Sequence, residues 1–521
     1  MMRIFIIIGM LVFSSLCANA SNYPLQIAFP IPAGTGTPMI PSTHPIFRAY
    51  PGIAYNIRPH IQGGAYPFTF ALSGQPAGMT INASTGEINW PEPDTTTGAI
   101  TLTVTDSELT IEQSTWVVTV STSGYLFVDA SYTGTETGSI NQPFSTIENL
   151  LAGTADTTTI VYFRTGTYHL PVHNPADGTD HDCNMDNEPT AWIGYPGETA
   201  TIDMDANYFQ YGTAPYYFDS LTVIDIPDWF IHEVESGDDY AVLRRLDLSG
   251  GRALYRSDNA NQGVYYTSRT VSGYYLTVQD NTIHDMDDLH AVGSLYEQIS
   301  PLIEDNTIYN MTSTIGGRPV FASKHNGGRH TYRRNNVYAT NGRLILGGSS
   351  NGLFRCIEDI EVMFNRFDVG ETANAAWFNN DAGAVADPND ECGPPYIQGT
   401  TFFYRNTVIG HVIHNNFNDN SCAGTTGGPW DYSGNVIVNS NNSYTSVDYI
   451  SYRYPEAASP ENCITDQSNV KGTASVGIVD ADGLLVGSYR DTYLGVAGWE
   501  IGDAPPTTTV SRGTVPLGDM R

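Results

Sequence analysis

An asparagine recurs at similar intervals through the second half of the chain. Six such asparagines share one frame, with an apolar or aromatic residue three positions before and another two positions after: Asn281, Asn306, Asn335, Asn365, Asn406 and Asn435. The gaps between them are 25, 29, 30, 41 and 29 residues. A period of about 20 to 50 residues with stacked apolar columns is typical of a solenoid. We therefore expect these asparagines to form a hydrogen-bonded ladder from coil to coil.

The same frame predicts two inward columns of side chains. The positions three before the asparagines are Val278, Ile303, Tyr332, Val362, Phe403 and Tyr432. The positions two after them are Ile283, Ile308, Val337, Phe367, Val408 and Ile437. Successive side chains of a strand alternate between faces, so each column is expected to face the core.

Residues 21–122 have a different sequence pattern. The segments "FTFALSG", "GEINW", "AITLTVTD" and "STWVVTVS" alternate apolar and polar residues between turn residues, which predicts half-buried strands of a sandwich. The stretch "YPFTFALSGQPAGMTINASTGEINWPEP" resembles the Ig-like, cadherin-like modules of secreted bacterial proteins. The resemblance implies a spacer, or a weak binder of carbohydrate or protein.

The stretches "FVDASYTGTETGSINQPFSTIENLLAG" and "TTIVYFRTGTYHL" resemble the start of pectate-lyase-type proteins. The resemblance implies a right-handed parallel β-helix over residues 123–503, with a tail at 504–521. A short helix at 146–151 is expected to cover the open end of the first coil, because uncovered strand edges invite unwanted pairing. The predicted fold class is all-β, a parallel β-helix preceded by a small Ig-like sandwich.

The first residues, "MMRIFIIIGMLVFSSLCANA", combine an early arginine, an apolar run and small residues at the end. This pattern predicts a signal peptide over residues 1–20, cleaved after Ala20. The apolar run is too short for a stable membrane span. We expect a secreted or periplasmic protein without a membrane span.

The chain is strongly acidic except in one window. Its formal net charge is −32, and its two lysines are Lys324 and Lys471. Such acidity argues against nucleic acid as a partner of the whole surface. Residues 306–357, called here the basic window, contain no Asp or Glu but hold Arg318, Lys324, Arg329, Arg333, Arg334, Arg343 and Arg355. An acid-free window is expected where an acidic polysaccharide approaches.

The repeat frame predicts a structural role for one residue of this window. Arg334 falls in the column of Asp305, one coil spacing of about 4.8 Å away, which predicts a ladder ion pair. Other members lie in "SKHNGGRH", a Gly-containing stretch between coils: Lys324, His325, Arg329 and His330. Loops on a rigid scaffold commonly carry function.

A uronate polysaccharide suits these residue types. Arginine binds a carboxylate through two parallel hydrogen bonds, and neutralising that carboxylate makes the adjacent C–H bond more acidic. A base can then remove the proton as the glycosidic oxygen leaves, which is β-elimination. A lysine becomes such a base when neighbouring cations favour its neutral form.

The segment "ASKHNGGRHTYRRNNVYATNGRLILGG" is similar to the lysine-bearing coil of the alginate and dermatan lyases related to chondroitinase B. The similarity implies that Lys324 is the base. The arginine of that family falls here at Gly347, and its acidic pair before the lysine is missing, so Arg343 or Arg355 would have to substitute. The resulting hypothesis makes Lys324 and Arg343 catalytic. It assigns substrate binding to Arg329, Arg333, His325 and His330.

Calcium is a candidate cofactor. The segment "HDMDD" before the basic window supplies Asp285, Asp287 and Asp288, and calcium prefers about six to eight oxygen ligands. An ordinary solvated loop is the alternative interpretation.

Two other functions stay open from the sequence. The basic window could bind an acidic glycan without catalysis, as in an adhesive surface protein with the Ig-like module as its stalk. Alternatively, carboxylates meeting across coils could hydrolyse a glycoside, with Asp280, Glu304 and Asp305 as the candidates.

Overall fold

The computed structural model describes the chain from residue 24 to residue 472 with gaps. The described ranges are 24–36, 39–153, 156–173, 182–185, 187–205, 207–211, 216–226, 229–233, 239–250, 253–257, 274–286, 292–296, 299–311, 319–324, 327–338, 343–348, 357–369, 374–380, 401–409, 411–415, 430–433, 435–438, 450–452, 464–467 and 470–472. The predicted signal peptide and the predicted C-terminal tail lie outside these residues. Within the described residues, no helix is both long and apolar enough to cross a membrane.

The N-terminal part is a β-sandwich, called here the Ig-like module. Its strands, with one short 3₁₀ helix at Pro45–Phe47, are β1 (Gln26–Phe29), β2 (Arg48–Ala49), β3 (Tyr55–Ile57), β4 (His60–Gln62), β5 (Thr69–Ser73), β6 (Thr80–Ile81), β7 (Ile88–Trp90), β8 (Ile100–Thr105), β9 (Ile111–Trp116) and β10 (Thr119–Val120). The pairs β5–β8 and β8–β9 are antiparallel, as alternation in the sequence predicts. Trp90 and Trp116 are each 1% exposed and lie in the core of the module.

From β11 onward the chain forms a right-handed parallel β-helix. Its longest face is a twelve-stranded sheet among the described residues: β11 (Tyr125–Val128), β12 (Ile160–Phe163), β15 (Ala191–Gly194), β18 (Tyr217–Asp219), β21 (Val242–Arg244), β24 (Thr277–Gln279), β27 (Leu302–Glu304), β30 (Gly328–Arg333), β33 (Ile357–Met363), β36 (Thr401–Tyr404), β39 (Trp430–Ser433) and β42 (Ile464–Gln467).

The other two faces are also parallel. In the described part of the chain, the second face is an eleven-stranded sheet: β13 (Gly166–His169), β16 (Ala200–Asp203), β19 (Thr222–Ile224), β22 (Asp247–Ser249), β25 (Thr282–His284), β28 (Thr307–Tyr309), β31 (Asn336–Tyr338), β34 (Arg366–Asp368), β37 (Thr407–Ile409), β40 (Val436–Val438) and β43 (Val470–Gly472). The third face comprises a four-stranded sheet, β14 (Asp182–Asn184), β17 (Tyr208–Tyr211), β20 (Trp229–Glu233) and β23 (Ala253–Ser257), and a six-stranded sheet, β26 (Val292–Tyr296), β29 (Pro319–Lys324), β32 (Arg343–Gly348), β35 (Asn374–Asn380), β38 (His411–Asn415) and β41 (Ile450–Tyr452).

The short covering helix is present as α1, Ile147–Leu151. Thr146 is its N-cap, and the hydroxyl of Thr146 accepts a hydrogen bond from the backbone N–H of Asn149 at 3.1 Å. Ile147, Leu150 and Leu151 are buried in the same core as the first coils. The predicted amphipathic cover of the first coil is therefore confirmed.

The asparagine ladder is confirmed. The side-chain amide of each asparagine donates to the side-chain oxygen of the next, at 2.9, 2.9, 2.9, 3.0 and 3.2 Å along the series from Asn281 to Asn435. The residue before each of Asn281, Asn306, Asn335, Asn365 and Asn406 has a left-handed φ between 53° and 58°. The ladder amides thus supply hydrogen bonds at the bend where the chain leaves the twelve-stranded sheet. Within the described residues, the side chains of both predicted inward columns are buried.

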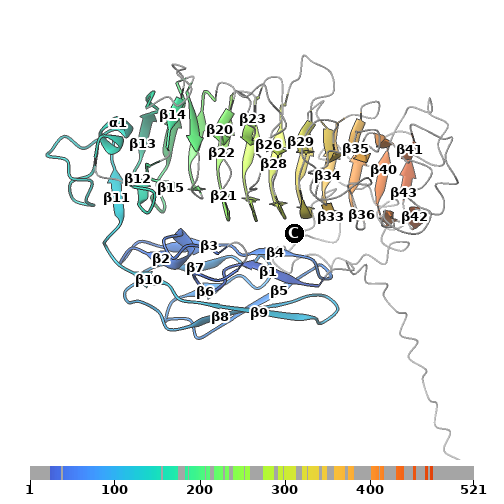
Figure 1. Cartoon of the computed structure of the whole chain (residues 1–521), viewed down its shortest axis with the longest axis horizontal. Coiled ribbons are helices and arrows are strands. Elements are labelled where there is room, and N and C mark those ends of the chain that lie inside the picture. The colour runs from blue at the N-terminus through green and yellow to red at the C-terminus, as the bar shows by residue number, and fades with distance from the viewer. Residues whose placement is uncertain are drawn as a thin grey trace, which may run out of the picture.

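The Ig-like module lies alongside the coils, next to the twelve-stranded sheet, as Figure 1 shows. Hydrogen bonds join the two parts over a long distance in sequence. Arg48 donates to the carbonyl of Thr158 at 2.5 Å, and Gln62 donates to the carbonyls of Pro301 and Arg329 at 3.1 and 3.0 Å. The module is therefore in contact with coils from the first strands of the β-helix to the basic window.

Candidate functional site

The outward face of the twelve-stranded sheet carries charged side chains that the Ig-like module buries. One outward column contains five polar residues between 0% and 2% exposed: Asp219, Arg244, Gln279, Glu304 and Arg333. In an isolated β-helix these side chains would face water. Here they face the module, so each charge needs a partner inside the interface.

Arg58 of the module supplies one such partner. Its guanidinium bonds Asp280 at 2.8 Å, pairs with Asp305, and lies 3.4 Å from Glu304. Arg334 reaches the same acids, at 2.6 Å from Asp305 and 3.1 Å from Glu304. The predicted ladder pair between Arg334 and Asp305 is confirmed. The sequence reasoning missed Arg58, whose partners lie more than 200 positions away along the chain.

Arg333 completes this interface network. Its guanidinium donates to Glu304 through Nε at 2.7 Å. It also lies 5.1 Å from the ring centre of Phe68 and 5.5 Å from that of Tyr66, both in the module. Cation–π contacts of this kind are strongest where water is excluded. Arg333 is thus held by one acid and two aromatic rings of the interface.

The network changes the acidity of its carboxyl groups. Burial alone would raise the pKa of Glu304, but the Arg333, Arg58 and Arg334 guanidiniums outweigh burial and lower the pKa to about 2. Burial likewise opposes ionisation of Asp305, and Arg334 and Arg58 hold its pKa well below the ordinary range. Both acids are therefore charged at neutral pH, which suits an interface role rather than acid catalysis.

These contacts correct the expectation that Arg329, Arg333 and His330 face a polysaccharide. Arg329 is 6% exposed and donates to the carbonyl of Pro24 at 3.3 Å. His330 is 0% exposed, and burial lowers its pKa to about 4. Because the module and the core cover these side chains, they stabilise the junction of the two domains. His325 lies outside the described residues.

Lys324 and Arg343 belong instead to the six-stranded sheet. Lys324 ends β29, and Arg343 begins the neighbouring strand β32. The register pairs Ala322 with Ile345, so two residues further along Lys324 is opposite Gly347. Gly347 lies four residues after Arg343 in β32, which is roughly 13 Å at about 3.3 Å per residue. The register therefore does not bring the two predicted catalytic residues together.

Other polar residues share the level of Lys324. Tyr296 of β26 is its partner on one side. On the other side, Gly347 pairs with Asn379 of β35, which in turn pairs with Asn415 of β38. The sequence reasoning missed this row because it is visible only once the strands of the third face are aligned.

The six-stranded sheet is also free of acids. Its described strands, β26, β29, β32, β35, β38 and β41, contain no Asp or Glu, although the chain has 55 of them. They do contain Lys324, Arg343 and two histidines, His411 and His414. By contrast, the four-stranded sheet on the same face contains Asp182 and Glu233. The strands β29 and β32 of the basic window thus belong to a longer run of acid-free strands along one sheet.

The predicted calcium group lies at the opposite edge of this sheet from Lys324. Asp285 follows β25 and precedes β26, whereas Lys324 is level with Tyr296, the last residue of β26. The carboxylate of Asp285 is bonded by His284 at 2.7 Å and by Asn310 at 3.1 Å. Asp287 and Asp288 lie outside the described residues.

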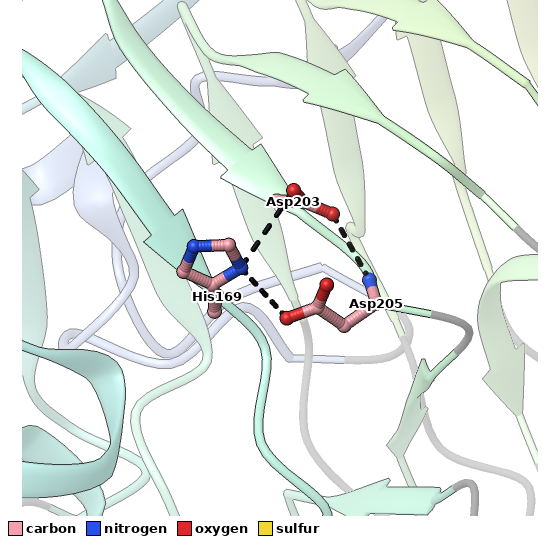
Figure 2. Close-up of side chains that lie close together, drawn as sticks. All are labelled: His169, Asp203 and Asp205. Atoms are coloured by element: carbon pink, nitrogen blue, oxygen red, sulfur yellow. Dashed lines mark hydrogen bonds and ion pairs between the residues drawn. The ribbon is translucent and has the colours of Figure 1, made fainter.

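Figure 2 shows a separate cluster at the start of the β-helix, formed by His169, Asp203 and Asp205. His169 Nδ1 lies 2.7 Å from Asp205 and 3.6 Å from Asp203. One ligand atom from each side chain lies within 4.8 Å of the others, close enough to share a metal ion. Among the described residues, this group has the spacing that a metal site requires, but two of its three members are exposed.

Comparison with known proteins supports the assignment of the N-terminal part. Residues 37–122 match the family described as "Putative Ig domain". Two solved structures are similar at low identity. One is pectate lyase Pel9A, at 14% identity and a TM-score of 0.33, covering 75% of this chain and 90% of that one. The other, from Bacteroides fragilis, is described as "a putative alpha-galactosidase", at 13% identity and a TM-score of 0.16, covering 37% of this chain and 46% of that one. No curated protein sequence matches the chain.

Proposed function

We propose that this protein acts on an anionic, uronate-containing polysaccharide that lies across the six-stranded sheet. The observation that carries the proposal is the absence of Asp and Glu from the described strands of that sheet, in a chain of net charge −32. A polyanion is repelled by most of such a surface and least by this sheet. From β11 to β30 the twelve-stranded sheet is not available in this arrangement, because the module lies against these strands.

Lys324 is the proposed catalytic base. In β-elimination, the neutral amine would take the proton from the carbon next to the carboxylate. The electron pair of that C–H bond would form a carbon–carbon double bond, while the bond to the glycosidic oxygen breaks and a water molecule protonates this oxygen. Tyr296, Asn379 and Asn415 share the register level of Lys324 and are the proposed contacts for sugar hydroxyl or carboxylate groups.

The test measures ultraviolet absorbance of the unsaturated uronate, which elimination creates and hydrolysis does not. The mature chain is incubated with alginate, pectate and dermatan, with calcium and with a chelator. We expect Lys324→Ala to lower the rate by about 10²–10⁴-fold, the usual contribution of a general base. Lys471→Ala is the matched control, since Lys471 is the other lysine and lies in β43 of the eleven-stranded sheet. A signal that survives Lys324→Ala would overturn the catalytic assignment.

Calcium remains part of this proposal, through the group that includes Asp285. A cation there would neutralise substrate carboxylates rather than touch Lys324. Loss of activity in the chelator, restored by calcium, is the expected result. Equal rates with and without the chelator would remove calcium from the proposal.

The competing function is binding without catalysis, for which the same acid-free sheet is the supporting observation. In that case no unsaturated product forms on any polymer, yet alginate or pectate binds, and binding weakens as salt is added. Arg343→Ala is then expected to weaken binding several-fold.

A further inference from the structure

A cleft opens where the Ig-like module meets the first coils. It has a volume of about 240 Å³. One wall comes from β3, β7 and the 3₁₀ helix of the module, and the other from coil turns that include residues 194–198, Ser220 and Arg245. Binding sites for small molecules are frequent at such domain junctions.

The charged groups that line this cleft already have hydrogen-bond partners within the protein. Arg164 pairs with Glu198 at 2.6 Å. Arg245 donates to Asp219 at 2.8 and 3.0 Å. Arg48 donates to three backbone carbonyls at the start of the β-helix. The cleft therefore suits an uncharged ligand better than an ion.

Two amide side chains supply hydrogen-bonding capacity. Asn56 and Asn89 are paired in register on β3 and β7. Asn56 donates through Nδ2 to Glu87 at 2.8 Å, while its buried Oδ1 has no hydrogen-bond partner among the described residues. Unpartnered buried acceptors are rare in proteins. A rotation of the Asn56 amide would bring Oδ1 to the cleft, where a ligand hydroxyl would satisfy it, and the neighbouring amide of Asn89 offers both donors and an acceptor.

Aromatic rings form the rest of the lining. Four tyrosines contribute to it: Tyr55, Tyr162, Tyr195 and Tyr217. Arg164 lies 4.3 Å from the ring centre of Tyr195 and fixes this ring, which is inclined at 71° to Tyr162. Aromatic rings with a few convergent polar groups are typical of pockets for small organic ligands.

We propose that this cleft binds one uncharged sugar residue. A sugar ring combines hydroxyl groups, which match the amides of Asn56 and Asn89, with an apolar C–H face, which matches the ring of Tyr195. At about 30 Å³ per water molecule, the cleft holds about eight waters, which one sugar ring would displace. This inference does not depend on the proposed function, because it concerns a different ligand class and a different face of the molecule.

The test is saturation-transfer NMR on the mature chain with D-galactose, D-glucose, D-mannose and D-xylose, and with D-galacturonate as the charged comparison. We expect transfer to at least one neutral sugar. Asn89→Ala should weaken its binding at least tenfold, and so should Tyr195→Ala. Asn141→Ala, at an exposed turn residue that does not line the cleft, is the matched control and should bind as the unmodified chain does.

Three results would overturn the inference: no transfer to any neutral sugar, equal binding by Asn89→Ala and Tyr195→Ala, or tighter binding of galacturonate than of every neutral sugar. Circular dichroism checks that each variant is folded. Lys324→Ala should leave this binding unchanged, so failure of the lyase proposal and failure of the cleft proposal are distinguishable.

Discussion

Glu304 is the residue on which most charges of the module–coil interface depend. Its carboxylate is 2% exposed and lies within 3.4 Å of three guanidiniums, those of Arg58, Arg333 and Arg334. Forming a buried ion pair gains little net stability, because both ions lose their water. Removing one member costs much more, because the others stay buried without compensation.

We therefore expect Glu304→Gln to destabilise the protein by about 3–5 kcal/mol. The isosteric amide keeps the shape of the side chain but leaves three guanidiniums with one carboxylate fewer. Urea unfolding followed by circular dichroism measures the change. Glu92→Gln, on an exposed turn of the module, is the matched control and should change stability by less than about 0.5 kcal/mol. Equal midpoints for the two variants would show that the charge network does not contribute to stability.

At the scale of elements, the repeat frame predicts the contacts that neighbouring coils make with each other. The column of Asn335 and the ion pair between Arg334 and Asp305 depend on a spacing that is visible in the sequence, and both are confirmed. The sequence contains no such repeat signal for the docking of the module onto the coils. Arg58 has no repeat partner, and its bond to Asp280 joins residues 222 positions apart.

The same limit explains the correction of the candidate site. Arg333 follows the inward-facing Tyr332, so its side chain points out of the coil. The repeat frame contains no information that the module lies on that face, so it cannot predict that this arginine is buried. The cluster of His169, Asp203 and Asp205 was missed for a related reason, since its members come together only when β13 and β16 pair.

The ladder itself supports a prediction about the coils. Asn335 donates to the carbonyl of Ile303 and to Asn365, both at 2.9 Å, and its Oδ1 accepts from the side chain of Asn306 at 2.9 Å. Asn335→Ala removes all three of these buried hydrogen bonds, and we expect a loss of at least about 3 kcal/mol.

The adjacent Asn336→Ala is the matched control for that variant. Asn336 is only half-buried and accepts one long bond from Arg366 at 3.4 Å, so its removal should cost less than about 1 kcal/mol. Urea unfolding of the two variants gives the comparison. A similar loss in both would mean that the ladder adds nothing beyond an ordinary surface asparagine.

At the scale of the whole molecule, two buried histidines of the module, together with His330 of the coils, make the protein sensitive to acid. His44 Nε2 donates to the carbonyl of Tyr240 at 3.1 Å, and His60 Nδ1 lies 2.8 Å from the hydroxyl of Thr277. Burial lowers the pKa of His44 from 6.5 to about 4 and that of His60 from 6.5 to about 3. Both rings are therefore neutral in the folded protein at pH values where the unfolded chain binds protons.

The sign of the pH dependence follows from these pKa values. Above pH 6.5 the histidines are neutral in both states. Between pH 6.5 and about 4 the unfolded chain binds more protons, so the free energy of unfolding falls as the pH is lowered. Glu304 adds to this fall below pH 4.5, since its folded pKa is about 2. Asp280 acts with the opposite sign, because burial raises its pKa.

We expect thermal unfolding to show this directly, with a melting temperature that falls steadily from pH 6.5 to pH 4. Each additional proton that the unfolded chain binds lowers the free energy of unfolding by about 1.4 kcal/mol per pH unit. His60→Gln should flatten the dependence, whereas His169→Gln, whose side chain is 66% exposed, should not. A melting temperature independent of pH over this range would contradict the neutral, buried state of both rings.

The extent of the interface also determines how the two domains unfold. Domains joined by a small polar interface move and unfold separately, but a large one with buried charges and aromatic rings couples them. The contacts run from Arg48 at the first coil to Pro24 at the basic window. We therefore expect one calorimetric transition for the module and the coils, although their cores differ in sequence texture.

Arg58→Ala tests this coupling, because the substitution is in the module while the acids that it leaves unpaired, Asp280 and Asp305, are in the coils. The single transition should move to lower temperature, and amide exchange should accelerate in β24 and β27 as well as in the module. Gln113→Ala, on exposed strand β9, should change neither. Two separate transitions, with only that of the module shifted, would instead make the module a tethered spacer, and the twelve-stranded sheet would again be a candidate surface for the polysaccharide.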